Sequence, residues 1–239
     1  MKFIDWMHYD FPLNEAIIGG GHSREVCGYD GMDPPQKHPI GINPSIRYEA
    51  VKNALDDTSR VNTRLCHHGF FQTDAKRPER REILETLAGS DVFSLWFKLA
   101  VKLDYRMGAI PERYFKTLVE HRFVVSPRGI GEDCYRTYEA LLCKAIPIIQ
   151  EPVMEGSFIT EKYSGLPVVY TRDYSELSRE YLNGLYDDIL ETDYDFDKLS
   201  LTYWTGKSPT LRRQMEYWLR FHDNTSWYSV LGMDDSRER

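Results

Sequence analysis

Short apolar runs alternate along the chain with longer segments in which apolar residues recur at helical spacing. The short runs, rich in β-branched and aromatic residues, favour buried strands, and the periodic segments favour amphipathic helices. The expected strands are residues 61–71, 91–99, 123–125, 146–149 and 166–171. The expected helices are residues 46–56, 78–87, 111–121, 133–145, 175–191, 196–202 and 208–222. This alternation predicts an α/β fold, a Rossmann-like parallel sheet with helices on both faces.

The first 60 residues lack this order, because Gly19-Gly20-Gly21 and Pro34-Pro35 interrupt them. Only residues 46–56 have helical periodicity there. We therefore divide the chain into an irregular N-terminal segment, residues 1–60, and an α/β domain with C-terminal helices, residues 61–239.

Composition narrows the classes of partner and compartment. The net charge of −7, with no basic stripe, disfavours nucleic acid, and 16 tyrosines suit half-buried surfaces that hydrogen-bond sugars. No apolar run approaches the roughly 20 residues that cross a bilayer, and the first ten residues lack the apolar core of a signal peptide. The 4 cysteines have no metal-binding spacing, which is typical of a reducing compartment. We expect a soluble, cytoplasmic protein.

Residues 123–151 are the most informative segment, and they predict a strand, a glycine loop, a helix and a second strand. Gly129 and Gly131 let the loop backbone lie close to a ligand, and the loop leads into a helix N-terminus, where α/β sheets bind phosphates. Arg128 and Arg136 flank the loop with fixed positive charges. The segment predicts a site for an anionic ligand.

Ordinary structural roles compete for several of these residues. Arg136 and Glu139 are i,i+3 neighbours on the predicted helix, so a surface ion pair explains their spacing as well as a ligand site does. Asp133 is either the cap of this helix or a ligand contact, and Ser126 either completes a strand end or contacts the ligand. His67-His68-Gly69 lies at the carboxyl end of the first expected strand, at the same edge, where a histidine is either structural or in contact with phosphate or acceptor.

The pattern SPRGxGxDCxRTxEAL, followed by an IPII strand, resembles the donor-sugar domain of exostosin-type glycosyltransferases. The segments YSGLPVV at residues 163–169 and DYSEL at residues 173–177 continue the resemblance. Upstream, Thr73 with the pair Arg80-Arg81 is similar to the family's segment after the first strand, so the resemblance covers about residues 61–195.

The resemblance implies the donor-binding half of a GT-B glycosyltransferase, which moves a hexosyl or pentosyl group from a nucleotide-sugar, a UDP-sugar, to a hydroxyl of a glycan or glycoconjugate. The implied donor contacts are Ser126, Arg128, Gly129, Ile130, Gly131, Asp133, Arg136 and Glu139, with His67, Gly69, Thr73 and Arg80 as further candidates. In the family pattern Glu139 holds the ribose hydroxyls. Loop amides and arginines stabilise the diphosphate leaving group, so we expect no metal and no other cofactor.

The resemblance also implies inversion at the anomeric carbon, with a general base that deprotonates the acceptor hydroxyl. One candidate is His68 at the end of the first strand. The others lie in the N-terminal segment and are His8 and Asp10, with Asp5, Glu15 and His22 beside them. Residues 1–60 are a remnant or an acceptor-side region, so a partner chain or a second copy is the expected source of a missing acceptor side. The alternative function is a non-catalytic nucleotide-sugar-binding subunit that needs a partner chain. Animal and plant exostosins are mostly membrane-anchored Golgi proteins, and the expected cytoplasmic location departs from that.

Overall fold

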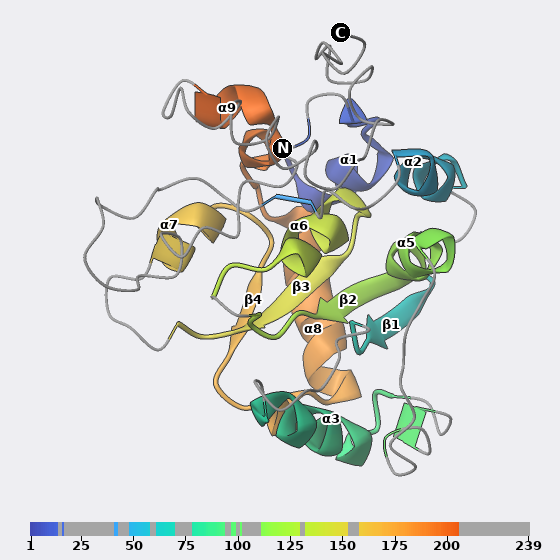
Figure 1. Cartoon of the computed structure of the whole chain (residues 1–239), viewed down its shortest axis with the longest axis vertical. Coiled ribbons are helices and arrows are strands. Elements are labelled where there is room, and N and C mark those ends of the chain that lie inside the picture. Colours follow the sequence, from blue (N-terminus) through green and yellow to red (C-terminus); the bar gives the residue numbers. More distant parts are fainter. Residues whose placement is uncertain are drawn as a thin grey trace, which may run out of the picture.

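The fold is built around a four-stranded parallel sheet in the order β1-β2-β3-β4 (Figure 1). The structure is a computed structural model that describes residues 1–13, 16, 41–42, 48–57, 61–69, 78–93, 97–98, 101, 111–129, 132–152 and 158–205. The strands are β1 (Arg64–His67), β2 (His121–Val125), β3 (Ile146–Gln150) and β4 (Val169–Thr171). The predicted α/β, Rossmann-like class is confirmed.

Helices connect each strand to the next. They are α3 (Glu79–Gly89) and α5 (Pro111–Glu120) before β2, α6 (Tyr135–Leu142) before β3, and α7 (Phe158–Tyr163) before β4. After β4 come the 3₁₀ helix η4 (Tyr174–Glu176), α8 (Arg179–Glu191), the 3₁₀ helix η5 (Phe196–Leu199) and α9 (Leu201–Thr205). Before β1 lie α1 (Phe3–His8) and α2 (Tyr48–Asp56). α5 and α6 lie on one face of the sheet, and α8 crosses the other face (Figure 1).

The core lies where the central strands meet these helices. Phe123, Val124 and Val125 of β2 have no exposed surface, as expected for a parallel strand that is covered on both faces. α8 buries Leu182, Tyr186 and Ile189 at helical spacing. Its N-cap, Ser178, accepts a hydrogen bond from the Tyr181 backbone N–H at 3.1 Å.

Several predicted boundaries are wrong. The strand expected at residues 91–99 is not found in the described part of that range, because residues 91–93 form a turn and a bend, and residues 97–98 are helical. The single helix expected at residues 175–191 is divided, because Leu177 and Ser178 are extended between η4 and α8. The predicted helix at residues 208–222 lies outside the described residues.

The N-terminal segment is not irregular throughout, because residues 3–8 form α1. Phe3 and Trp6 on this helix are fully buried. The Trp6 indole N–H donates to the Leu141 carbonyl at 3.1 Å, which joins α1 to the last turn of α6. α1 therefore belongs to the core of the α/β domain. Of the helices that the structure describes, none is long and apolar enough to cross a membrane.

Candidate active site at the carboxyl edge of the sheet

The carboxyl ends of β1, β2 and β3 come together at one side of the sheet, which we call the carboxyl edge. The chain leaves β1 towards Gly69, β2 into residues 126–129, and β3 into Glu151. The Ser126 N–H donates to the Ile148 carbonyl at 2.8 Å, so the sheet bonding continues one residue beyond β2. In open parallel sheets ligands bind outside this edge.

Gly69 holds the end of β1 close against β2. Its φ is +80°, and a Cβ atom there would lie 1.9 Å from the Val125 carbonyl oxygen. The Gly69 N–H donates to His67 Nδ1 at 2.9 Å, and its carbonyl accepts from Arg136 Nε. The positive φ and the close carbonyl oxygen together require glycine at this position. The bond from Arg136 joins α6 to the end of β1.

Two arginines, Arg80 and Arg128, have different roles at the loop after β2. Arg80 on α3 is 5% exposed and donates from Nε and Nη2 to the Arg128 carbonyl, at 3.2 and 2.8 Å. The Arg128 side chain is itself 43% exposed, and its Nε lies 3.8 Å from the Glu79 carboxylate. Arg80 therefore holds the loop backbone, while Arg128 presents a positive charge at the carboxyl edge.

The prediction that Asp133 caps α6 is wrong, because α6 begins at Tyr135 with Cys134 as its N-cap. The Asp133 carboxylate instead accepts hydrogen bonds from Lys162 Nζ at 2.9 Å and Tyr163 Oη at 2.7 Å, both on α7. The Lys162 and Asp133 side chains are only 4% and 3% exposed. Removing one partner of a buried ion pair costs about 3–5 kcal/mol, so this cluster joins the end of the glycine loop firmly to α7.

Glu139 and Arg136 do not form a surface ion pair, although their i,i+3 spacing is compatible with one. Glu139 is 4% exposed, and its carboxylate accepts a hydrogen bond from Tyr114 Oη at 2.7 Å. Burial, reinforced by this carboxylate, raises the pKa of Tyr114 well above its usual value, so the phenol stays a donor. Arg136 is half-buried. Both side chains thus lie beneath the carboxyl edge.

A small cleft opens on the carboxyl edge beside Ser126 and Arg128. Ser126 is 1% exposed, and its hydroxyl lies 3.0 Å from that of Thr137, which joins β2 to α6. Glu132 and Glu151 also line the cleft. The cleft encloses about 10 Å³, whereas a cavity of about 360 Å³ lies at the opposite end of α6, among aromatic residues. The lining carries charges of both signs, with Arg128 beside Glu132 and Glu151.

Three histidines pack together under the end of β1. The ring centroids of His67 and His68 are 4.2 Å apart, and those of His67 and His121 are 5.0 Å apart. Burial lowers the pKa of His68 to about 3 and that of His67 well below its usual value. All three rings are buried and neutral at neutral pH. A neutral imidazole can accept a proton, but the burial of these rings keeps them from a ligand at the surface.

The structure does not bring every candidate to this edge. His8 and Asp10 are exposed and belong to the N-terminal segment, which contacts the last turn of α6 through Trp6. The eight residues of α6, about 12 Å at the usual helical rise, separate that contact from the glycine loop. Asp5 lies on α1 as well. The remaining candidates, Glu15, His22, Thr73, Ile130 and Gly131, lie outside the described residues.

Sequence reasoning missed several residues of this edge. Glu151 directly follows β3, so the rule that ligands lie at the carboxyl ends of parallel strands identifies it. Lys162 and Tyr114 reach the site from distant segments, and no local pattern marks them. Within the residues that the structure describes, no group of three or more His, Cys, Asp or Glu is arranged to hold a metal ion.

The fold and the carboxyl edge together define a Rossmann-like α/β domain with an arginine-flanked glycine loop. Comparison with known proteins gives the family: a model described as "RXYLT1 C-terminal domain" matches residues 65–184, and the chain belongs to this family. Ribitol-5-phosphate xylosyltransferase 1 of Danio rerio is 20% identical over 149 residues, which cover 58% of this chain and 34% of that protein. The chain therefore spans about a third of the length of this relative. The resemblance to exostosin-like glycosyltransferases is confirmed.

Proposed function

We propose that this chain is a glycosyltransferase domain that binds the diphosphate of a nucleotide-sugar at the carboxyl edge. The observation that carries the proposal is the exposed Arg128 guanidinium beside the glycine loop, with its own backbone held by Arg80. Arginine suits this ligand because its planar group pairs with phosphate oxygens at two points. Family membership supports sugar transfer as the reaction class.

In the proposed reaction an acceptor oxygen forms a bond to the anomeric carbon as the bond from that carbon to the β-phosphate breaks. The nucleoside diphosphate leaves, and the acceptor proton passes to a general base. Negative charge grows on the leaving diphosphate, so Arg128 stabilises the transition state more than the ground state, and no metal is required. Inversion of the anomeric centre follows if the acceptor attacks from the opposite face.

The cleft carries charges of both signs, which matches the two ends of this donor. Arg128 suits the diphosphate, whereas Glu132 and Glu151 can accept hydrogen bonds from sugar hydroxyls. The name of the Danio rerio relative describes a xylosyltransferase that acts on ribitol 5-phosphate. We therefore place UDP-xylose first among donors and a polyol phosphate or glycan among acceptors.

The test is a calorimetric titration with UDP and with UDP-xylose, UDP-glucose and UDP-galactose, followed by an assay of UDP release from each donor. We expect saturable UDP binding and slow release of UDP from one donor, unchanged by EDTA. No binding of UDP or of any UDP-sugar would contradict the proposal.

The second candidate is a binding subunit without catalysis. It is favoured by one observation: His8 and Asp10, two of the candidate bases, lie by the other end of α6 from the glycine loop. UDP binding without hydrolysis or transfer, across all donors and acceptors, would select this function.

A further inference from the structure

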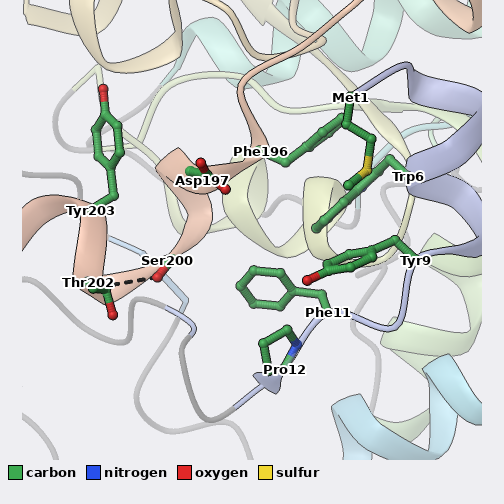
Figure 2. Close-up of a pocket in the computed structure, with 10 residues that line it drawn as sticks. All are labelled: Met1, Trp6, Tyr9, Phe11, Pro12, Phe196, Asp197, Ser200, Thr202 and Tyr203. Atoms are coloured by element: carbon green, nitrogen blue, oxygen red, sulfur yellow. Dashed lines mark hydrogen bonds between the residues drawn. The ribbon is translucent and has the colours of Figure 1, made fainter.

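A cavity of about 360 Å³ lies at the end of α6 that is remote from the carboxyl edge (Figure 2). It is formed between the N-terminal segment, residues 1–12, and residues 196–203 around η5 and α9. Ligand-binding cavities typically measure about 300–1,000 Å³, so this one has room for a small molecule. The diphosphate chemistry of the carboxyl edge makes no use of it.

A preformed aromatic stack lies directly behind one wall of the cavity. Trp6 is fully buried, and its ring lies parallel to that of Phe196, with centroids 4.2 Å apart and an angle of 6°. Lys144 Nζ lies 3.7 Å from the centroid of the Trp6 ring and donates to the Tyr9 carbonyl at 2.8 Å. These contacts hold the Tyr9 backbone in place, so a ligand meets a wall that needs little reordering.

Two polar groups belong to facing sides of this cavity. Tyr9 is 43% exposed, and its hydroxyl enters the cavity from the N-terminal segment, while the Asp197 carboxylate comes from η5 (Figure 2). Among the residues that the structure describes, neither the hydroxyl nor the carboxylate has a hydrogen bond or an ion pair. The Ser200 side chain, by contrast, accepts from the Thr202 N–H at 3.1 Å.

We propose that this cavity binds a neutral sugar ring. An exposed tyrosine face packs against the C–H face of a sugar, and its hydroxyl, with the carboxylate opposite, hydrogen-bonds the ring hydroxyls. An anion is disfavoured because Asp197 faces the cavity. A cation is disfavoured because the Lys144 ammonium already lies against the Trp6 ring and 6.0 Å from the Tyr9 ring centroid.

The sugar site goes beyond the proposed function, because it lies away from the glycine loop and needs no nucleotide. A glycan bound there would be held at the end of the domain that is remote from the carboxyl edge. Its test is therefore independent of donor binding.

The experiment uses the full chain and the methyl glycosides of xylose, glucose and galactose, without nucleotide. Binding is measured by saturation-transfer NMR and by Trp fluorescence. We expect saturable binding of at least one glycoside, and a loss of affinity of about 10-fold or more in Tyr9→Ala and in Asp197→Asn. Tyr181→Ala is the matched control, because Tyr181 is 46% exposed and lies on α8, and it should bind as the wild type does.

Two results would overturn the proposal. They are the lack of saturable binding for every glycoside, and wild-type affinity in both Tyr9→Ala and Asp197→Asn. Asp197 is exposed, so Asp197→Asn keeps the test valid if Tyr9→Ala does not fold. Since the titration contains no nucleotide, its failure would leave the donor proposal unchanged.

Discussion

Replacing Gly69 by alanine should destabilise the domain strongly, because two costs add at this position. The φ of +80° is left-handed, a conformation that costs a residue with a side chain roughly 1–2 kcal/mol. The new Cβ would lie 1.9 Å from the Val125 carbonyl oxygen and 2.9 Å from Arg136 Cδ, so the ends of β1 and β2 must separate. We expect the free energy of unfolding to fall by roughly 3–5 kcal/mol.

Gly184→Ala is the matched control for this substitution. Gly184 lies inside α8 and is exposed, and a Cβ added there would meet no neighbouring atom within 4 Å. Alanine at this position should therefore stabilise the helix by up to about 1 kcal/mol. The assay is urea unfolding of both variants and the wild type, followed by circular dichroism. If Gly69→Ala were as stable as Gly184→Ala, the close approach of β1 to β2 would be refuted.

Three further predictions concern the residues around the carboxyl edge. Lys162→Met should lower the free energy of unfolding by about 3–5 kcal/mol, and adding Asp133→Asn should restore part of the loss; additive losses in urea unfolding would contradict a coupled pair. Burial lowers the pKa of His68 to about 3, against about 6.5 in the unfolded chain, so stability that is present above pH 6.5 should be lost as the pH falls below that value. His68→Phe should therefore reduce the slope of the free energy of unfolding against pH between pH 7 and 5. An unchanged slope would contradict this prediction. If Glu139 holds the ribose, the wild type should bind UDP about 10-fold more tightly than 2′-deoxy-UDP, and Glu139→Gln should remove this preference; a preference that persists would rule out the ribose role.

The central strands were predictable because parallel strands that are covered on both faces are continuous apolar runs. β2 and β3 show this directly, and the Ser-Pro and glycine punctuation after β2 located the loop at the carboxyl edge. Residues 91–99 had similar apolar content, yet the described residues 91–93 and 97–98 are turn, bend and helix, because short apolar runs do not distinguish strand from helix.

Within the site, local spacing predicted residue types and missed their partners. Asp133 had the residue type and position of a helix cap. Its carboxylate instead accepts hydrogen bonds from Lys162 and Tyr163, which lie about 30 residues further along the chain. Glu139 had the spacing of a surface pair, and its burial depends on Tyr114 from α5. These contacts are set by how helices pack on the sheet, which periodicity does not encode.

The central claim is that Arg128 at the carboxyl edge binds the donor diphosphate, and UDP affinity in two arginine variants tests it most directly. Arg128→Ala should weaken UDP binding by about 10-fold to 100-fold, as expected for lost hydrogen bonds to a charged group. Arg64→Ala removes the same charge at the amino end of β1, where the side chain is 68% exposed, and should bind UDP as the wild type does. Equal affinities of the two variants for UDP, measured by calorimetry, would contradict the account.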